Sequence, residues 1–198
     1  MKTHTLSEAA TFRAADYGKI LPNPVPRFNR QSFSPTEIST LYQQALAFHR
    51  DNRFDEAESL YRQILDVMPN HPGALHFRGM VRFARDDPAE AVRLIEQSLC
   101  FCNTKAVYFN NYGAVLNKQK RYPEAKKAFE EALILDPNYP DAYSNLGLVS
   151  VLLGEPGHVA EHHFHSALRL QPNHRDALRH SVDFLFKDER YEESLPFL

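Results

Sequence analysis

From Ser34 onward, apolar residues recur at spacings of three and four positions, in blocks of about fourteen residues. This is the periodicity of an amphipathic α-helix, and no stretch reads convincingly as a β-strand. The first helix is expected to begin at SPTE, residues 34–37. Ser34 can cap it, Pro35 suits its first turn, and Glu37 completes a capping box. The pattern therefore predicts an all-α fold.

Residues 1–33 have a different composition from the rest of the chain. The stretch PNPVPRF, at residues 22–28, places three prolines in five positions, which favours extended backbone. We therefore expect an N-terminal extended and partly disordered segment over 1–33 and a helical array over 34–198.

The array contains an internal repeat. Residues 121–147, RYPEAKKAFEEALILDPNYPDAYSNLG, match residues 53–79, RFDEAESLYRQILDVMPNHPGALHFRG, at nine of 27 positions. The two stretches begin at Arg121 and Arg53, so their offset is 121 − 53 = 68, or twice 34. Units of half this offset fit the chain at 38–71, 72–105, 106–139 and 140–174, with a partial unit at 175–198. The fourth unit needs one extra residue, which fits in the turn GEPGH at 154–158.

Small and aromatic residues stand at fixed positions of these units. In the third unit, positions 4, 8, 20, 24, 27 and 32 hold Phe109, Gly113, Ala125, Phe129, Ala132 and Pro137. On these residues, the sequence over 38–198 resembles the tetratricopeptide repeat family, whose unit is a helix–turn–helix of about 34 residues. The resemblance implies a right-handed superhelical solenoid of antiparallel helix pairs, with about four and a half units. The second unit departs from the pattern, with Ile95, Ser98 and Asn103 where Phe, Ala and Pro are usual.

The physical role of the small residues follows from the close approach of paired helices. We expect Gly113 to face Ala125 across one pair, because a bulky side chain there would separate the two helices. Phe129 is expected to fill the space between one pair and the next. A single pair cannot bury its own apolar face, so neighbouring pairs must stack, and the array should present one concave face.

Composition and charge exclude several classes of function. The chain has 43% apolar and 24% charged residues and a formal net charge of −2, which argues against a nucleic-acid surface. No apolar run is long enough to span a bilayer, and the start of the chain lacks the apolar core of a signal peptide. Cys100 and Cys102 fit neither a structural disulfide nor a zinc pattern. We therefore expect a cytoplasmic protein that binds neither nucleic acid nor membranes.

Catalytic motifs are missing from the sequence. It has no Gly-rich phosphate loop, no HExxH and no GxSxG, so we expect no enzymatic activity within the chain. His158 and His162 are one helical turn apart with Glu161 nearby, an arrangement that fits either a metal pair or an exposed helix face. No third ligand is spaced convincingly, so we expect no metal site and no cofactor.

The concave face is the remaining candidate for function. In the resembling family it is lined by the first helix of each pair, which implies a partner-binding groove that grades from aromatic through amide-rich to charged. The groove residues expected here are Tyr42, Leu46, His76, Phe77, Met80, Phe83, Asn110, Asn111, Asn117, Asp141, Asn145 and Arg179.

The amides Asn111 and Asn145 occupy the same position of consecutive units. An Asn side chain offers both a donor and an acceptor, so it can hold a peptide backbone amide with two hydrogen bonds. Here the sequence is similar to the N-terminal arrays of O-linked N-acetylglucosamine transferases, in which a ladder of Asn grips extended protein substrates. The alternative is that Asn is simply the common residue at this position. A clamp for acidic chaperone tails is not expected, because the places of its cations hold no Lys or Arg.

These observations predict a non-catalytic interaction module that binds an extended peptide or a partner helix in the groove. The alternative is the substrate-recruiting domain of a larger glycosyltransferase-type enzyme. The partial fifth unit leaves apolar residues such as Phe184 and Phe186 near an open end. That end favours either a chain that is part of a longer protein or self-association through the C-terminal end. RNA binding is a third reading, which the acidic balance of the chain opposes.

Overall fold

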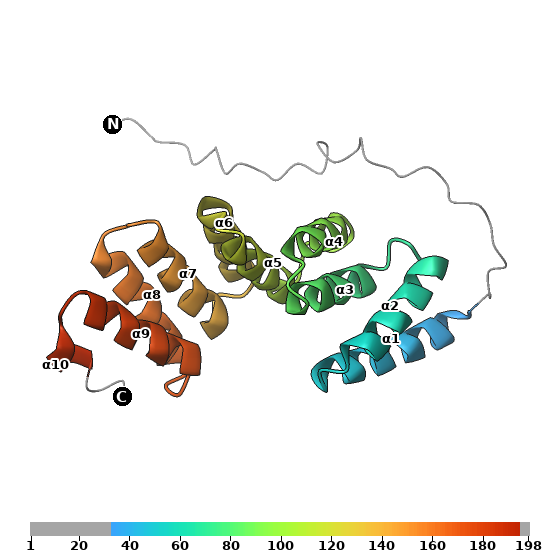
Figure 1. Cartoon of the computed structure of the whole chain (residues 1–198), viewed down its shortest axis with the longest axis horizontal. Helices are drawn as coiled ribbons and strands as arrows, with labels where there is room; N and C mark the ends of the chain where they lie inside the picture. Colours follow the sequence, from blue (N-terminus) through green and yellow to red (C-terminus); the bar gives the residue numbers. More distant parts are fainter. Residues whose placement is uncertain (1–32, 195–198) are drawn as a thin grey trace, which may run out of the picture. The chain divides into compact units, whose positions relative to one another are not determined.

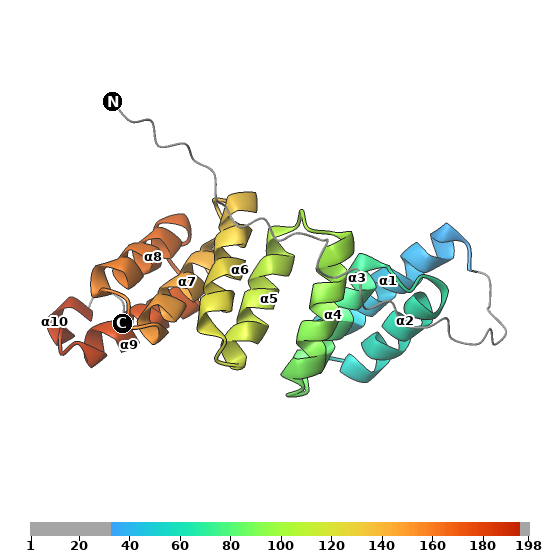
Figure 2. The same cartoon turned by 90° about the horizontal axis from the view of Figure 1, so that it is seen from above.

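The structure, a computed structural model, describes residues 33–194, which form helices joined by short turns (Figures 1 and 2). The expected extended segment lies outside the described residues, except for Phe33. The helices are α1 (Pro35–Arg50), α2 (Phe54–Val67), α3 (Pro72–Ala84), α4 (Pro88–Phe101), α5 (Ala106–Lys118), α6 (Tyr122–Leu135), α7 (Pro140–Leu152), α8 (Gly157–Leu170), α9 (Arg175–Lys187) and α10 (Tyr191–Ser194). The predicted all-α fold is confirmed. None of these helices combines the length and the apolar character needed to cross a membrane.

The predicted start of the array is confirmed in detail. Ser34 is the N-cap of α1, and its Oγ accepts a hydrogen bond from the backbone N–H of Glu37 at 3.3 Å. The Glu37 carboxylate in turn accepts from the Ser34 backbone N–H at 2.7 Å. This reciprocal pair satisfies N–H groups that a helix start otherwise leaves without partners.

The helices pack in pairs, and the pairs stack in chain order. The first helix of each pair packs on the second, and the second then packs on the first helix of the next pair. First helices also touch one another in succession, from α1 through α3, α5 and α7 to α9. Figure 1 shows this succession from the blue end of the array to the red end. The first helices therefore lie together along one face.

The turn between the two helices of a pair recurs with one backbone signature. Asn52, Asp86, Lys120, Gly154 and Glu189 each adopt a positive φ, between 58° and 70°. They follow one another in the sequence at intervals of 34, 34, 34 and then 35. The helix α8 begins three positions after Gly154, whereas α6 begins two positions after Lys120. The extra residue of the fourth unit therefore lies in its turn, as predicted.

The contact made by the helix glycines differs from the expected one. A Cβ added to Gly113 would lie 2.5 Å from a ring carbon of Phe129, and one added to Gly147 would lie 2.5 Å from a ring carbon of Phe164. These rings, and not Ala125, are the nearest neighbours of the glycine. The ring at position 24 is thus a nearer neighbour of the glycine than the expected alanine, whereas in the second unit a Cβ added to Gly79 would also lie 3.2 Å from the backbone oxygen of Ala91, the counterpart of Ala125. In the third and fourth units, the missing Cβ makes room for the aromatic ring.

The second unit keeps the fold with different side chains. Ile95 replaces the aromatic ring, and its Cγ1 would lie 2.8 Å from a Cβ added to Gly79. Ser98 is fully buried, and its Oγ donates to the backbone carbonyl of Pro72 at 2.8 Å. This bond ties the end of α4 to the start of α3 without the usual packing residue.

Candidate partner-binding face

The first helices are joined side chain to side chain at two positions of the repeat. Position five of one unit contacts position six of the next, and we call the residues of these contacts the row. The row consists of the pairs Tyr42–Phe77, His76–Asn111, Asn110–Asn145 and Ser144–His180. The sequence predicted that this face exists, but it did not predict which residues pair along it.

The row begins in an aromatic cluster. The ring centroid of Phe77 lies 6.5 Å from that of Tyr42, 5.5 Å from that of His49 and 6.4 Å from that of Tyr61. Burial lowers the pKa of His49, so burial favours its uncharged form. Tyr42 and Phe77 are half-buried, so part of each ring is exposed. This end of the face therefore offers an uncharged aromatic surface to a partner.

His76 connects the aromatic cluster to the amides. Its ring is fully buried and stacks on Tyr108, with centroids 3.8 Å apart and planes at 9°. Burial lowers the pKa of His76 to about 3, and the neighbouring His49 and Lys105 lower it further. The neutral ring can accept the hydrogen bond from Asn111, whose Nδ2 lies 2.9 Å from Nε2. His76 therefore fixes the orientation of the Asn111 amide.

The next contact of the row is made by two amides. Asn145 donates from Nδ2 to Oδ1 of Asn110 at 3.0 Å. Burial raises the pKa of the nearby Tyr139 to about 12, and the carboxylate of Asp141 raises it further, whereas the Asn110 side chain lowers it. Asn110 is buried and Asn145 is half-buried. An Asn amide has two N–H groups and one oxygen, so Asn145 keeps one N–H and its oxygen for a ligand.

The C-terminal end of the row is polar and charged. The Oγ of Ser144 lies 3.1 Å from Nδ1 of His180, and Arg179 donates from Nη2 to Nε2 of the same ring at 3.0 Å. Burial lowers the pKa of His180, and the positive charge of Arg179 lowers it further. Asp141 bonds to Nε2 of His174 at 2.9 Å. Asp141 and Arg179 are exposed, so they present opposite charges at this end.

The predicted groove residues fall into three groups by exposure. Asp141 and Arg179 are exposed, and His76 and Asn110 are buried. The half-buried group consists of Tyr42, Leu46, Phe77, Met80, Phe83, Asn111, Asn117 and Asn145. Met80 and Phe83 pack against the core that extends from α4 to α7, and Oδ1 of Asn117 is buried without a hydrogen-bond partner. His76 and Asn110 position their neighbours in the row and are not on the surface.

Some residues that shape this face were not predicted from the sequence. His71 and His174 are N-caps of α3 and α9, and each accepts through Nδ1 from the backbone N–H of the alanine three positions later. The signal is present in the sequence, because NHPGAL and NHRDAL repeat the same spacing of His, Ala and Leu. No comparable repeated spacing in the sequence pointed to Tyr108 or Tyr139.

The described residues offer no arrangement for a metal. Across residues 33–194, no group of three or more His, Cys, Asp or Glu side chains could hold an ion. Cys100 is exposed and Cys102 is half-buried, and both are free thiols.

Two family models match this chain. The model described as tetratricopeptide repeat matches residues 42–103, and the model described as TPR repeat matches residues 113–154. Both matches lie within the helical array, the first over helices α1 to α4 and the second over helices α5 to α7.

Two curated proteins illustrate the range of relatives. The chain is 30% identical over 152 residues to the type IV pilus assembly protein PilF of Pseudomonas aeruginosa, covering 75% of this chain and 60% of PilF. It is 27% identical over 163 residues to the protein O-mannosyl-transferase TMTC3 of Homo sapiens, covering 75% of this chain and 18% of TMTC3. The chain thus spans less than two thirds of the length of either relative.

Solved structures share the fold of the array. A structure of Pseudomonas aeruginosa PilF superposes with a TM-score of 0.72 at 27% identity, covering 81% of this chain and 72% of that chain. The structure of YrrB, described as a TPR protein with an unusual peptide-binding site, gives a TM-score of 0.63 at 21% identity, covering 79% and 80% of the two chains.

Proposed function

Because this chain contains tetratricopeptide repeats, we propose that it is a non-catalytic interaction module that binds an extended peptide or a partner helix along the row. The aromatic end would take an apolar side chain of the partner against Tyr42 and Phe77. Asn111 and Asn145 would hold the partner's backbone.

One observation carries this proposal. Each of the two half-buried amides is held by a buried residue of the preceding unit, Asn111 by His76 and Asn145 by Asn110. A side chain that is already oriented loses less conformational entropy when it binds a ligand. The two amides also stand at the same position of consecutive units and therefore repeat at the spacing of the units. Such an arrangement suits an extended chain, whose backbone amides also repeat at regular intervals.

The named role of one relative agrees with this proposal. PilF is named as an assembly protein, and it is 30% identical to this chain. The finer similarity to the arrays of O-linked N-acetylglucosamine transferases stays a prediction, because PilF and TMTC3 are proteins of other kinds.

The proposal can be tested with peptides selected from a random library displayed on phage. We expect a selected peptide to bind the double variant Asn111→Ala/Asn145→Ala more weakly by about 1–3 kcal/mol, because its backbone loses two or more hydrogen bonds. This corresponds to a roughly 5- to 150-fold higher Kd by isothermal titration calorimetry.

The matched control changes two exposed asparagines in turns, Asn103→Ala/Asn173→Ala, and should bind as the wild type does. Circular dichroism checks that both variants are folded. Equal affinity of the wild type and the Asn111/Asn145 variant for every selected peptide would contradict the proposal.

A second candidate function is the recruiting arm of a larger glycosyltransferase-type enzyme. The similarity to TMTC3, a named mannosyl-transferase of which the chain covers 18%, favours it. An immunoblot of the source cells with an antibody to this array distinguishes the two candidates. A band near 22.8 kDa would favour the separate module, and a much larger band would favour the recruiting arm.

A further inference from the structure

A second line of side chains runs along the first helices beside the row. Position nine follows position five by one helical turn, so both positions lie on the same face of each first helix. At position nine the five units hold Leu46, Met80, Ala114, Leu148 and Asp183, which we call the position-nine line. Its first four members are half-buried, and Asp183 is exposed. The line therefore presents apolar side chains along four units and a carboxylate at the fifth.

The binding face proposed above carries no charged side chain at these positions of the first four units. Positions five, six, nine and twelve of those units hold no Asp, Glu, Lys or Arg. The same positions of the fifth unit include Arg179 and Asp183. A partner therefore meets an uncharged surface first and charged groups only at the C-terminal end.

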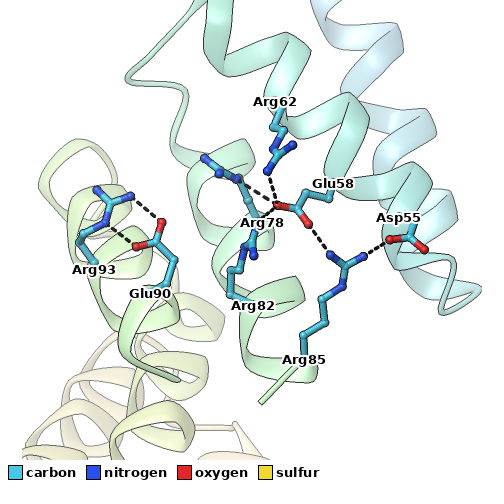
Figure 3. A network of polar contacts seen from close by, with 8 residues as sticks. All are labelled: Asp55, Glu58, Arg62, Arg78, Arg82, Arg85, Glu90 and Arg93. Carbon is cyan, nitrogen blue, oxygen red and sulfur yellow. Dashed lines mark hydrogen bonds and ion pairs between the residues drawn. The ribbon is translucent and has the colours of Figure 1, made fainter. Parts of the chain in front are cut away.

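The arginines of the second unit do not alter this distribution, because they pair on another side of α3 (Figure 3). Glu58 of α2 is 5% exposed. Its Oε2 accepts from Nη1 of Arg85 at 2.7 Å, and its Oε1 accepts from Arg82. The Nε of Arg78 lies 3.7 Å from Oε1. These arginines thus join α3 to the second helix of the preceding pair and add no charge to the position-nine line.

At the fifth unit, the charge that lacks an ion-pair partner is negative. Arg179 donates from Nη2 to Oδ1 of Asp176 at 3.3 Å, whereas no ion pair among residues 33–194 involves Asp183. Burial and Arg179 lower the pKa of His180, and the carboxylates of Asp176 and Asp183 partly offset this effect. Asp183 therefore lies close to the histidine that ends the row, and it offers a carboxylate to a cation of the partner.

The spacing of the units favours one backbone conformation of the partner. First helices touch one another in succession, and the axes of packed helices lie about 8–10 Å apart. A polyproline II helix presents the same face at every third residue, or about 9.3 Å. A β-strand presents the same face at every second residue, or about 6.6–6.8 Å, which is too short a step. One turn of polyproline II therefore matches one unit of the array.

The amides of the row favour the same conformation. The backbone N–H and C=O groups of a partner α-helix bond to one another, so they would leave Asn111 and Asn145 without backbone partners. A polyproline II helix has no internal hydrogen bonds, and its backbone groups are free to bond to these amides. Aromatic-lined grooves bind such segments, and Tyr42 and Phe77 provide aromatic surface at the N-terminal end of the row.

We propose that the partner is a peptide in the polyproline II conformation with an apolar residue at every third position, followed at the next third position by a Lys or Arg that pairs with Asp183. This proposal rests on the function proposed above and names the class of its ligand. The three-residue step places successive apolar side chains against Leu46, Met80, Ala114 and Leu148. The cation then faces Asp183, because this residue continues the position-nine line by one unit.

The first test selects random peptides displayed on phage against the full chain. Peptides bound by the wild type should carry apolar residues at three-residue intervals and a Lys or Arg one interval beyond the last of them. Peptides selected on Asp183→Lys should carry Asp or Glu at that place instead. The matched control is Asp66→Lys, which makes the same change at an exposed position of the second helix α2 and should select the same peptides as the wild type.

The second test exchanges the two charges and measures the Kd by titration calorimetry. Low ionic strength is used because salt screens exposed charges. For a peptide selected on the wild type, Asp183→Lys should raise the Kd at least tenfold, since it places two like charges together, and Asp66→Lys should leave the Kd unchanged. A peptide with Glu in place of its cation should then bind Asp183→Lys more tightly than it binds the wild type. This rescue also shows that the variant is folded.

Two results would overturn the proposal and leave the function proposed above intact. One is a set of binding peptides whose apolar residues do not recur at three-residue intervals. The other is the same Kd for Asp183→Lys and Asp66→Lys with every selected peptide. Failure of the wild type to select any peptide would contradict both proposals.

Discussion

At the scale of single residues, the row shows how a residue of one unit orients a side chain of the next unit on the proposed binding face. A buried residue at position five fixes a half-buried residue at position six, as His76 does for Asn111 and Asn110 does for Asn145. Substituting the buried partner should therefore change ligand binding without removing a residue that contacts the ligand. Burial also makes the charge state of His76 part of the stability of the fold.

Burial of His76 predicts a dependence of stability on pH. Its pKa is about 3 in the folded protein, and an unperturbed histidine titrates near ~6.5. Between these values the unfolded chain binds a proton that the folded chain does not bind, so the free energy of unfolding falls as pH falls below ~6.5. Replacement by Gln, which keeps a hydrogen-bonding group for Asn111, should reduce this loss by about 2 kcal/mol between pH 7.5 and 5.

Urea unfolding followed by circular dichroism at the two pH values measures this effect. The matched control is His158→Gln, an exposed histidine at the start of α8, which should lose as much stability as the wild type. The account of His76 is wrong if its Gln variant and the wild type lose the same free energy on acidification.

At the scale of elements, the recurring turn carries the most specific prediction. Lys120 has a φ of 60°, and a left-handed backbone costs a residue with a side chain about 1–2 kcal/mol. Glycine avoids this cost but loses more conformational freedom on folding, by up to about 1 kcal/mol. Lys120→Gly should therefore raise the free energy of unfolding by about 0.5–1 kcal/mol, measured by urea unfolding.

The matched control places glycine where the backbone is helical. Lys127 is exposed in the middle of α6, so Lys127→Gly should lower the free energy of unfolding by about 1 kcal/mol. If Lys120→Gly does not raise the free energy of unfolding, or if Lys127→Gly raises it as well, the left-handed backbone at Lys120 does not limit stability.

The elements themselves were largely predictable from the sequence, and their contacts less so. The repeat period predicted the helices and the extra residue after Gly154, and the SPTE motif predicted the capping box at Ser34, because these features depend on local sequence. The packing of Gly113 on Phe129 was not predicted, since the direction of a large ring depends on the space left by both helices. Ser98 replaces a packing residue with a hydrogen bond, which spacing alone does not reveal.

At the scale of the whole array, the proposed binding face exists only because consecutive units touch. Every contact of the row joins residues 35 or 36 positions apart, so no single unit contains one. The sequence predicted the positions that line this face, because a first helix recurs once in every unit. It did not predict that His76 and Asn110 are buried or that arginines gather around Glu58, because burial and charge pairing depend on two neighbouring units at once.

The central claim is that a peptide binds along the row, and photo-crosslinking tests it most directly. A benzoylphenylalanine is placed at Leu148, half-buried on the first helix α7, or at Ile134, which is 71% exposed on the second helix α6. A peptide selected for binding should crosslink at position 148 and not at position 134. Crosslinking at position 134 alone, or equally at both positions, would contradict the assignment of the binding face to the first helices.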